Sequence, residues 1–166
     1  MINGKEKLKI EKMRYVNNKL SYSFTLLAMC IYVLLVFWAI NPFRYNYLNK
    51  DATDVLYPDL WVGLKILLSI LVILLSFLTA EKVKAYDKKA SYRDFVFAAI
   101  VIIEIFIFPL NLFRYEAITL TRFITIILLS LISGALYTVA GIVNIRKVNE
   151  LAEVYKDEIK ELEHHE

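Results

Sequence analysis

Glu104, Lys65 and Arg122 are the charged residues best placed to do chemistry, because each lies in or beside a long apolar run. Glu104 stands nine residues before the end of the run 95–113, about 13 Å along a helix. A carboxylate at such depth in a membrane costs several kcal/mol unless it is paired, protonated or in contact with water. One interpretation is that Glu104 responds to protons or cations or binds a polar substrate. The other is that it forms an ion pair with Lys65 or Arg122, which fixes the register of the helices. We favour the ion pair, because two cations are in reach.

Other chemistry has no signature in this sequence. There is no phosphate-binding glycine loop, nucleophile elbow or His/Asp/Glu metal motif, so we predict no catalytic, cofactor-binding or metal-binding residues and no enzyme. The one cysteine, Cys30, lies in an apolar run and is expected to be a small buried residue. His164 and His165 are adjacent near the chain end and are expected to be solvated.

Four apolar runs dominate the chain, at 21–43, 60–80, 95–113 and 123–145. The first run has 23 residues and would reach about 34 Å as a helix, enough for a hydrocarbon core of about 30 Å. Hydrophobic residues make up 58% of the chain and its mean hydropathy is +0.51, too apolar for a soluble domain of this size. The prediction is an all-α, four-helix transmembrane bundle.

The distribution of Lys and Arg predicts the orientation of these spans. The N-terminal segment, the loop between the second and third runs, and the tail together hold fifteen of them, against four in the other two loops. Both termini are therefore predicted in the cytoplasm. A bias toward Lys, Ile, Asn and Tyr is typical of an AT-rich bacterial genome, so the location expected is a bacterial cytoplasmic membrane.

A partial repeat appears when the chain is shifted by 70 residues. Eight of the 27 positions from Lys19 to Tyr45 are then identical, including Asn-x-Phe-Arg-Tyr at both run ends. One interpretation is a duplicated two-helix hairpin, with the two copies parallel. The other is coincidence between apolar helices with similar interfacial anchors. Glu104 aligns with Leu34, so its role would be specific to the second half.

Small and hydroxylated residues recur at helical spacing in two runs. Ser130, Gly134, Thr138 and Gly141 form a row that predicts close helix packing. Lys65, Ser69, Ser76 and Thr79 form a second polar stripe. The favoured interpretation of these stripes is helix packing, and the alternative is a polar translocation path between the last three spans.

The two ends of the chain differ in charge. Residues 1–20 form a basic segment suited to an anionic lipid surface or to a solvated arm. Residues 146–166 form an acidic tail, predicted as an amphipathic helix that continues the fourth span. Its apolar positions are Val148, Leu151, Tyr155, Ile159 and Leu162. Acidic charge disfavours an anionic leaflet, so the partner expected here is another protein or a second copy.

These observations favour a non-catalytic, four-span subunit or accessory protein of a membrane complex. The alternatives are a small oligomeric transporter or channel that uses Glu104, and a membrane-bound regulator or immunity-type protein. The partners predicted are the lipid bilayer and other membrane proteins or further copies of the chain. Nucleic acid is not expected, because the basic residues lie between apolar runs and form no patch on a soluble domain.

Overall fold

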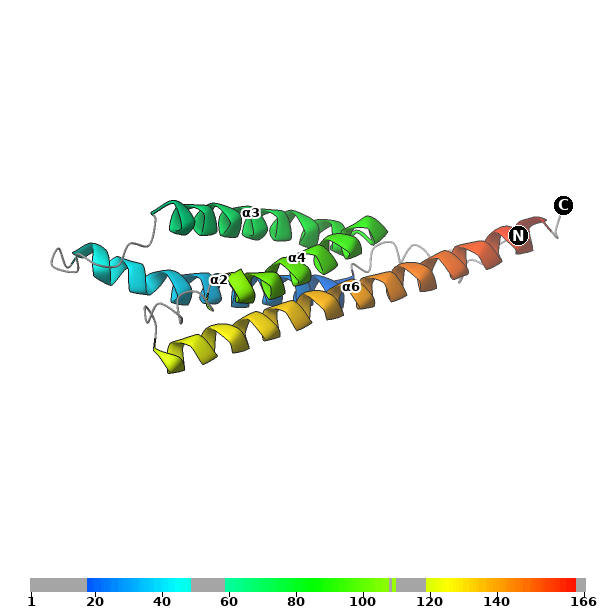
Figure 1. The fold of residues 1–166 in the computed structure, drawn as a ribbon. Coiled ribbons are helices and arrows are strands. Elements are labelled where there is room, and N and C mark those ends of the chain that lie inside the picture. Colours follow the sequence, from blue (N-terminus) through cyan, green and yellow to red (C-terminus); the bar gives the residue numbers. More distant parts are fainter. Residues whose placement is uncertain (1–17, 49–58, 108, 110–118, 164–166) are drawn as a thin grey trace.

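The computed structural model describes residues 18–48, 59–107, 109 and 119–163 of the chain. These residues form four helices and no strand, which confirms the all-helical prediction. The helices are α2 (Lys19–Leu48), α3 (Asp59–Lys84), α4 (Lys88–Ile107) and α6 (Leu120–Glu163) (Figure 1).

Three of these helices contain segments long and apolar enough to cross a membrane: Lys19–Ala39, Gly63–Lys84 and Leu120–Glu153. They support the assignment as a membrane protein. The third predicted span falls partly on α4, which carries five charged residues between Lys88 and Ile107. Its remaining residues, apart from Pro109, lie outside the described part of the chain. The third span, and with it the total of four spans, therefore stays a prediction, as does the orientation.

The helices pack with their polar side chains inside and many large apolar side chains outside. Phe37, Leu67 and Phe106 are each more than 60% exposed, whereas Ser76, Thr79 and Ser133 are fully buried. A water-soluble protein would leave no such continuous apolar surface in solvent. Because lipid tails provide no drive to bury apolar groups, this arrangement is the one expected of helices in a bilayer.

Helix α6 is the central packing partner of the described helices. It packs against both α2 and α4, while α3 bridges the same two helices from the other side. Its C-terminal part extends beyond the ends of the other three helices (Figure 1). The predicted continuation of the fourth apolar run is thus present as one unbroken helix to Glu163.

The side chains of that extension are described only as far as Glu153. Val148 and Leu151 are half-buried, and Glu150 pairs with Lys147 and Arg146 on the exposed surface. Tyr155, Ile159 and Leu162 belong to the helix, but their side chains lie outside the described residues. The predicted partner face therefore remains a prediction.

Small residues let α6 approach α4 closely, as the sequence row indicates. A Cβ on Gly134 would lie 3.0 Å from the side chain of Ile102. A Cβ on Gly141 would lie 3.0 Å from the ring of Phe95 and 3.1 Å from a backbone oxygen. Thr138 is half-buried and donates a hydrogen bond to the carbonyl of Gly134.

The predicted 70-residue repeat does not place its paired positions in equal surroundings. Ala28 and Ala98 are both buried, as the repeat would require. Leu34, however, is 60% exposed, whereas its counterpart Glu104 is buried. The buried face of α4 is therefore turned relative to that of α2 at this level. Duplication stays a hypothesis about descent.

Candidate functional site

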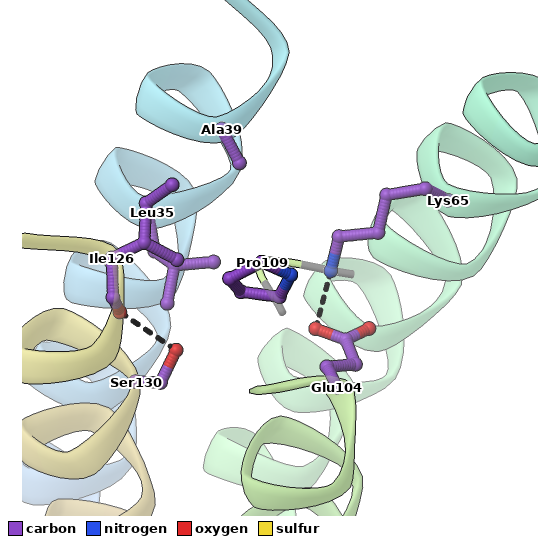
Figure 2. Close-up of a pocket in the computed structure, with 7 residues that line it drawn as sticks. All are labelled: Leu35, Ala39, Lys65, Glu104, Pro109, Ile126 and Ser130. Carbon is purple, nitrogen blue, oxygen red and sulfur yellow. Dashed lines mark hydrogen bonds and ion pairs between the residues drawn. The ribbon is translucent and has the colours of Figure 1, made fainter. Parts of the chain in front are cut away.

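Glu104 of α4 forms a buried ion pair with Lys65 of α3. The two side chains are 9% and 4% exposed, and their charged groups point toward one another (Figure 2). Of the two cations that the sequence offered as partners, the structure places Lys65 here. Arg122 lies instead over the ring of Trp38, with its guanidinium carbon 5.4 Å from the ring centroid.

Tyr32 of α2 adds a third helix to this pair. Its hydroxyl lies 3.0 and 3.1 Å from the two carboxylate oxygens of Glu104, to which it donates its proton. The Lys65 ammonium lies 5.4 Å from the centroid of the Tyr32 ring, within cation–π distance. Tyr32 was not among the predicted site residues, because one hydroxyl among many aromatic residues of an apolar run carries no distinguishing signal.

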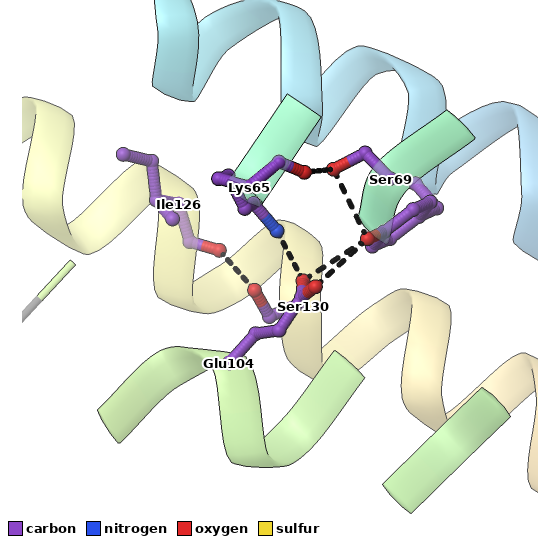
Figure 3. A network of polar contacts seen from close by, with 6 residues as sticks. Lys65, Ser69, Glu104, Ile126 and Ser130 are labelled. Carbon is purple, nitrogen blue, oxygen red and sulfur yellow. Dashed lines mark hydrogen bonds and ion pairs between the residues drawn. The ribbon is translucent and has the colours of Figure 1, made fainter. Parts of the chain in front are cut away.

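Ser69 completes the cluster of Glu104, Lys65, Tyr32 and Ser69, which we term the outer cluster. Its hydroxyl donates to the backbone oxygen of Lys65 at 2.7 Å (Figure 3). It also lies 3.4 Å from the Tyr32 hydroxyl. The carboxylate thus receives hydrogen bonds from an ammonium and a phenol. A buried charge so compensated avoids most of the penalty of an isolated one.

A small cavity opens beside the pair. Its volume is about 10 Å³, close to the least that one water molecule needs. It is lined by Leu35, Ala39, Lys65, Glu104, Pro109, Ile126 and Ser130 (Figure 2). The Ser130 hydroxyl donates to the carbonyl of Ile126 in its own helix. The cavity is therefore mostly apolar, with the ion pair as its charged wall.

Asp94 is a second buried acid on α4, and sequence analysis did not single it out. It is 0% exposed, and both carboxylate oxygens lie 3.3–3.4 Å from the hydroxyl of Thr25 on α2. It precedes the predicted third span by one residue and belongs to none of the three candidate spans. Burial raises the pKa of Asp94 to about 7, and the Thr25 hydrogen bond lowers it by less.

A hydrogen-bonded network joins the helix ends beyond Asp94. The side chain of Asn18 donates to that of Asn144 at 2.8 Å, and Asn144 in turn donates to the Ser91 hydroxyl and to the Asp87 carbonyl. The backbone amide of Asn18 donates to the carbonyl of Lys84. All four helices are thereby tied at the end predicted to face the cytoplasm.

The connection between α3 and α4 within this network is a tight turn. Tyr86 has a φ of 61°, and the amide of Asp87 donates to the carbonyl of Lys82. This is the pattern of a helix C-terminus closed by a left-handed residue. Asp87 then caps α4 through its side chain, which accepts from the amide of Lys89.

Between the two acids, polar side chains pair across the core. The hydroxyls of Ser76 on α3 and Tyr137 on α6 lie 2.7 Å apart. The Ser133 hydroxyl donates to the carbonyl of Ala28. Among the described residues, the Thr79 hydroxyl is the buried side-chain group that lacks a partner. Of the polar stripes identified in the sequence, Lys65, Ser69 and Ser76 contact side chains of other helices. Ser130 and Thr138 instead donate to carbonyls of their own helix.

Cys30, expected to be buried, is exposed on the apolar outer surface, so the structure corrects that prediction. Within the described residues, no group of three or more His, Cys, Asp or Glu side chains could hold a metal ion.

No family model matches the chain, and no curated protein or solved structure shows a significant match to it. Its function must therefore be argued from the clusters themselves.

Proposed function

We propose that this chain is a non-catalytic, four-span membrane protein that serves as a subunit or accessory protein of a membrane complex. Its helices would form a bundle with both termini in the cytoplasm. The outer cluster would hold three helices in register, and the extension of α6 would present a surface to a partner or to a second copy.

One observation carries this proposal: Glu104 is already satisfied by Lys65 and Tyr32. A transport site must exchange its partners for a substrate, whereas a pair held by two neighbouring helices favours one fixed arrangement. Such a buried polar group specifies register at some cost in stability. The unbroken course of α6 to Glu163 supports the second half of the proposal, because it provides a rigid arm beyond the packed helices.

The arm can be tested by ending the chain after Glu150. We expect this truncation to preserve folding, since the packed parts of α6 precede it, and to abolish association with the partner or the second copy. Cross-linking in native membranes, with the intact chain as control, measures this. An unchanged oligomeric state together with unchanged co-purifying proteins would contradict the docking role.

The transporter alternative has one observation in its favour, which is the cavity against Glu104 and Lys65. Proton and cation flux into vesicles distinguishes the two functions. For the wild-type chain we expect no proton or cation flux above that of empty vesicles. Flux that Glu104→Gln abolishes, while Ser130→Ala on the opposite cavity wall preserves it, would overturn the proposal.

A further inference from the structure

The contact between Asp94 and Thr25 has more acceptor oxygens than the Thr25 hydroxyl alone can donate to. The Thr25 hydroxyl has one proton, and it lies 3.2 Å from the carbonyl of Ser21 as well as 3.3–3.4 Å from the Asp94 oxygens. If Asp94 is ionised, three acceptor oxygens share this one proton. If Asp94 is protonated, it donates to Thr25 and Thr25 donates to Ser21, so each group is satisfied.

No cation compensates a charge on Asp94 within the described residues. None of their four ion pairs involves it. From α2 it meets Thr25, and from α6 the titratable group in its field is Tyr137, whose hydroxyl pairs with Ser76. On α3, Lys65 is held by Glu104.

The other cations near this end of the molecule are engaged or point outward. On α3, Lys84 lies near Glu81 and over the Tyr22 ring. On α4, Lys88 donates to Asn149 of α6, and Lys89 and Arg93 are exposed. Among the described residues a charged Asp94 would thus have no opposite charge beside it, which is the costly arrangement for a buried acid.

We propose that Asp94 is a proton-binding site, occupied in the resting protein, and that release of its proton weakens the Asp94–Thr25 contact that joins α4 to α2. This inference goes beyond the proposed structural role. The raised pKa of Asp94 agrees with it, because a group that titrates near neutral pH can change state in a cell.

The surroundings of Asp94 indicate which side exchanges the proton. Toward the predicted cytoplasmic end lie Ser21, Ser91 and Asn144, all buried and hydrogen-bonded. In the other direction lie Phe97 and Val101, which are apolar and buried. A released proton would therefore pass to water at the predicted cytoplasmic end, leaving a carboxylate that must draw in water or a new donor.

Carboxyl ¹³C NMR of the chain labelled at aspartate, in lipid nanodiscs from pH 4 to pH 9, tests the site. One aspartate signal is expected to titrate with a midpoint at about pH 7 and to vanish in Asp94→Asn. Asp87→Asn is the matched control, because it removes an acid from the same end while an asparagine still caps α4. It should leave the signal unchanged. If no aspartate titrates above about pH 5, near the ordinary range, the proposal is wrong.

Backbone hydrogen exchange tests the weakening of this contact. After correction for intrinsic pH dependence, residues 21–28 of α2 are expected to exchange several-fold faster above the midpoint than below it. Asp94→Asn, which resembles the protonated acid, should abolish that difference. A wild-type titration with no change in exchange would overturn the coupling to the contact between α4 and α2.

A second pair of variants tests the site even if the Asp94→Asn variant does not fold. Thr25→Val removes the hydroxyl that contacts both Asp94 oxygens, so the midpoint should shift away from the wild-type value of about pH 7. Thr25→Ser keeps the hydroxyl and should keep the midpoint. Equal midpoints in both variants would show that Thr25 is not the partner, contrary to the proposed site.

Discussion

Glu104 and Asp94 lie ten residues apart on the buried face of α4, about 15 Å along the helix. Their hydrogen-bond and ion-pair partners differ. Glu104 faces an ammonium and a phenol from two other helices. Asp94 faces one hydroxyl that already has a backbone acceptor. Burial alone thus does not decide the charge state of these two acids. The number of protons and cations offered to each acid decides whether it stays charged or binds a proton.

The largest effect is expected from removing the cation of the outer cluster. Lys65→Met leaves the Glu104 carboxylate buried with Tyr32 as its remaining partner, which should lower the free energy of unfolding by about 3–5 kcal/mol. Thermal denaturation in detergent measures this. Arg122→Met is the control, because Arg122 contacts Trp38 and not the acid. Equal losses of unfolding free energy in the two variants would contradict a specific role of Lys65 as the partner of Glu104.

The pH dependence of stability tests whether Asp94 binds a proton in the folded protein. In the unfolded chain an aspartate releases its proton at about pH 3.9, whereas the pKa of Asp94 in the folded protein is about 7. Between these values the folded form binds more protons, so stability falls as the pH rises, by roughly a few kcal/mol. The stabilisation is complete below about pH 4. Subtracting the profile of Asp94→Asn isolates the effect, and superimposable profiles would contradict it.

Removing the phenol from Glu104 should cost less than removing the ammonium. Tyr32→Phe keeps the ring over Lys65 and deletes one hydrogen bond to a carboxylate, worth about 1.5–3 kcal/mol. Denaturation of Tyr32→Phe and Lys65→Met under the same conditions shows which variant loses more unfolding free energy. A larger loss in Tyr32→Phe would mean that the hydroxyl, and not the ion pair, holds the outer cluster together.

A smaller effect is expected where α6 approaches α4 near Asp94. Gly141→Ala places a methyl 3.0 Å from the Phe95 ring and 3.1 Å from the carbonyl of Ser91, which should cost about 1–3 kcal/mol. Gly63→Ala is the matched control, because nothing lies within 4 Å of its new methyl. A helical alanine there should be neutral or stabilising. A stabilised Gly141→Ala protein would show that the two helices have room to separate.

The sequence predicts the outer cluster better than the Asp94 site, for a physical reason. A carboxylate and an ammonium inside apolar runs are costly, so Glu104 and Lys65 stand out from their neighbours in the sequence itself. Asp94 follows Lys88, Lys89 and Arg93 and resembles part of a charged loop. Its burial depends on the rotation of α4 against its neighbours, which hydropathy does not determine.

Hydropathy likewise does not determine which way Cys30 and Tyr32 face. Whether a residue of an apolar helix faces lipid or core depends on packing, since both surroundings are apolar. The sequence predicts a buried Cys30, which faces outward, and gives no sign that the Tyr32 hydroxyl faces Glu104. The glycine row on α6 is predictable, because close approach requires small side chains wherever the partner lies.

A double-mutant cycle tests whether Glu104 and Lys65 act as a structural pair. Lys65→Met, Glu104→Gln and the combined variant are compared by denaturation in one detergent. We expect the combined variant to be more stable than the sum of the single losses implies, by about 2 kcal/mol or more, because neither charge is then left unpaired. Strictly additive losses would contradict the pairing.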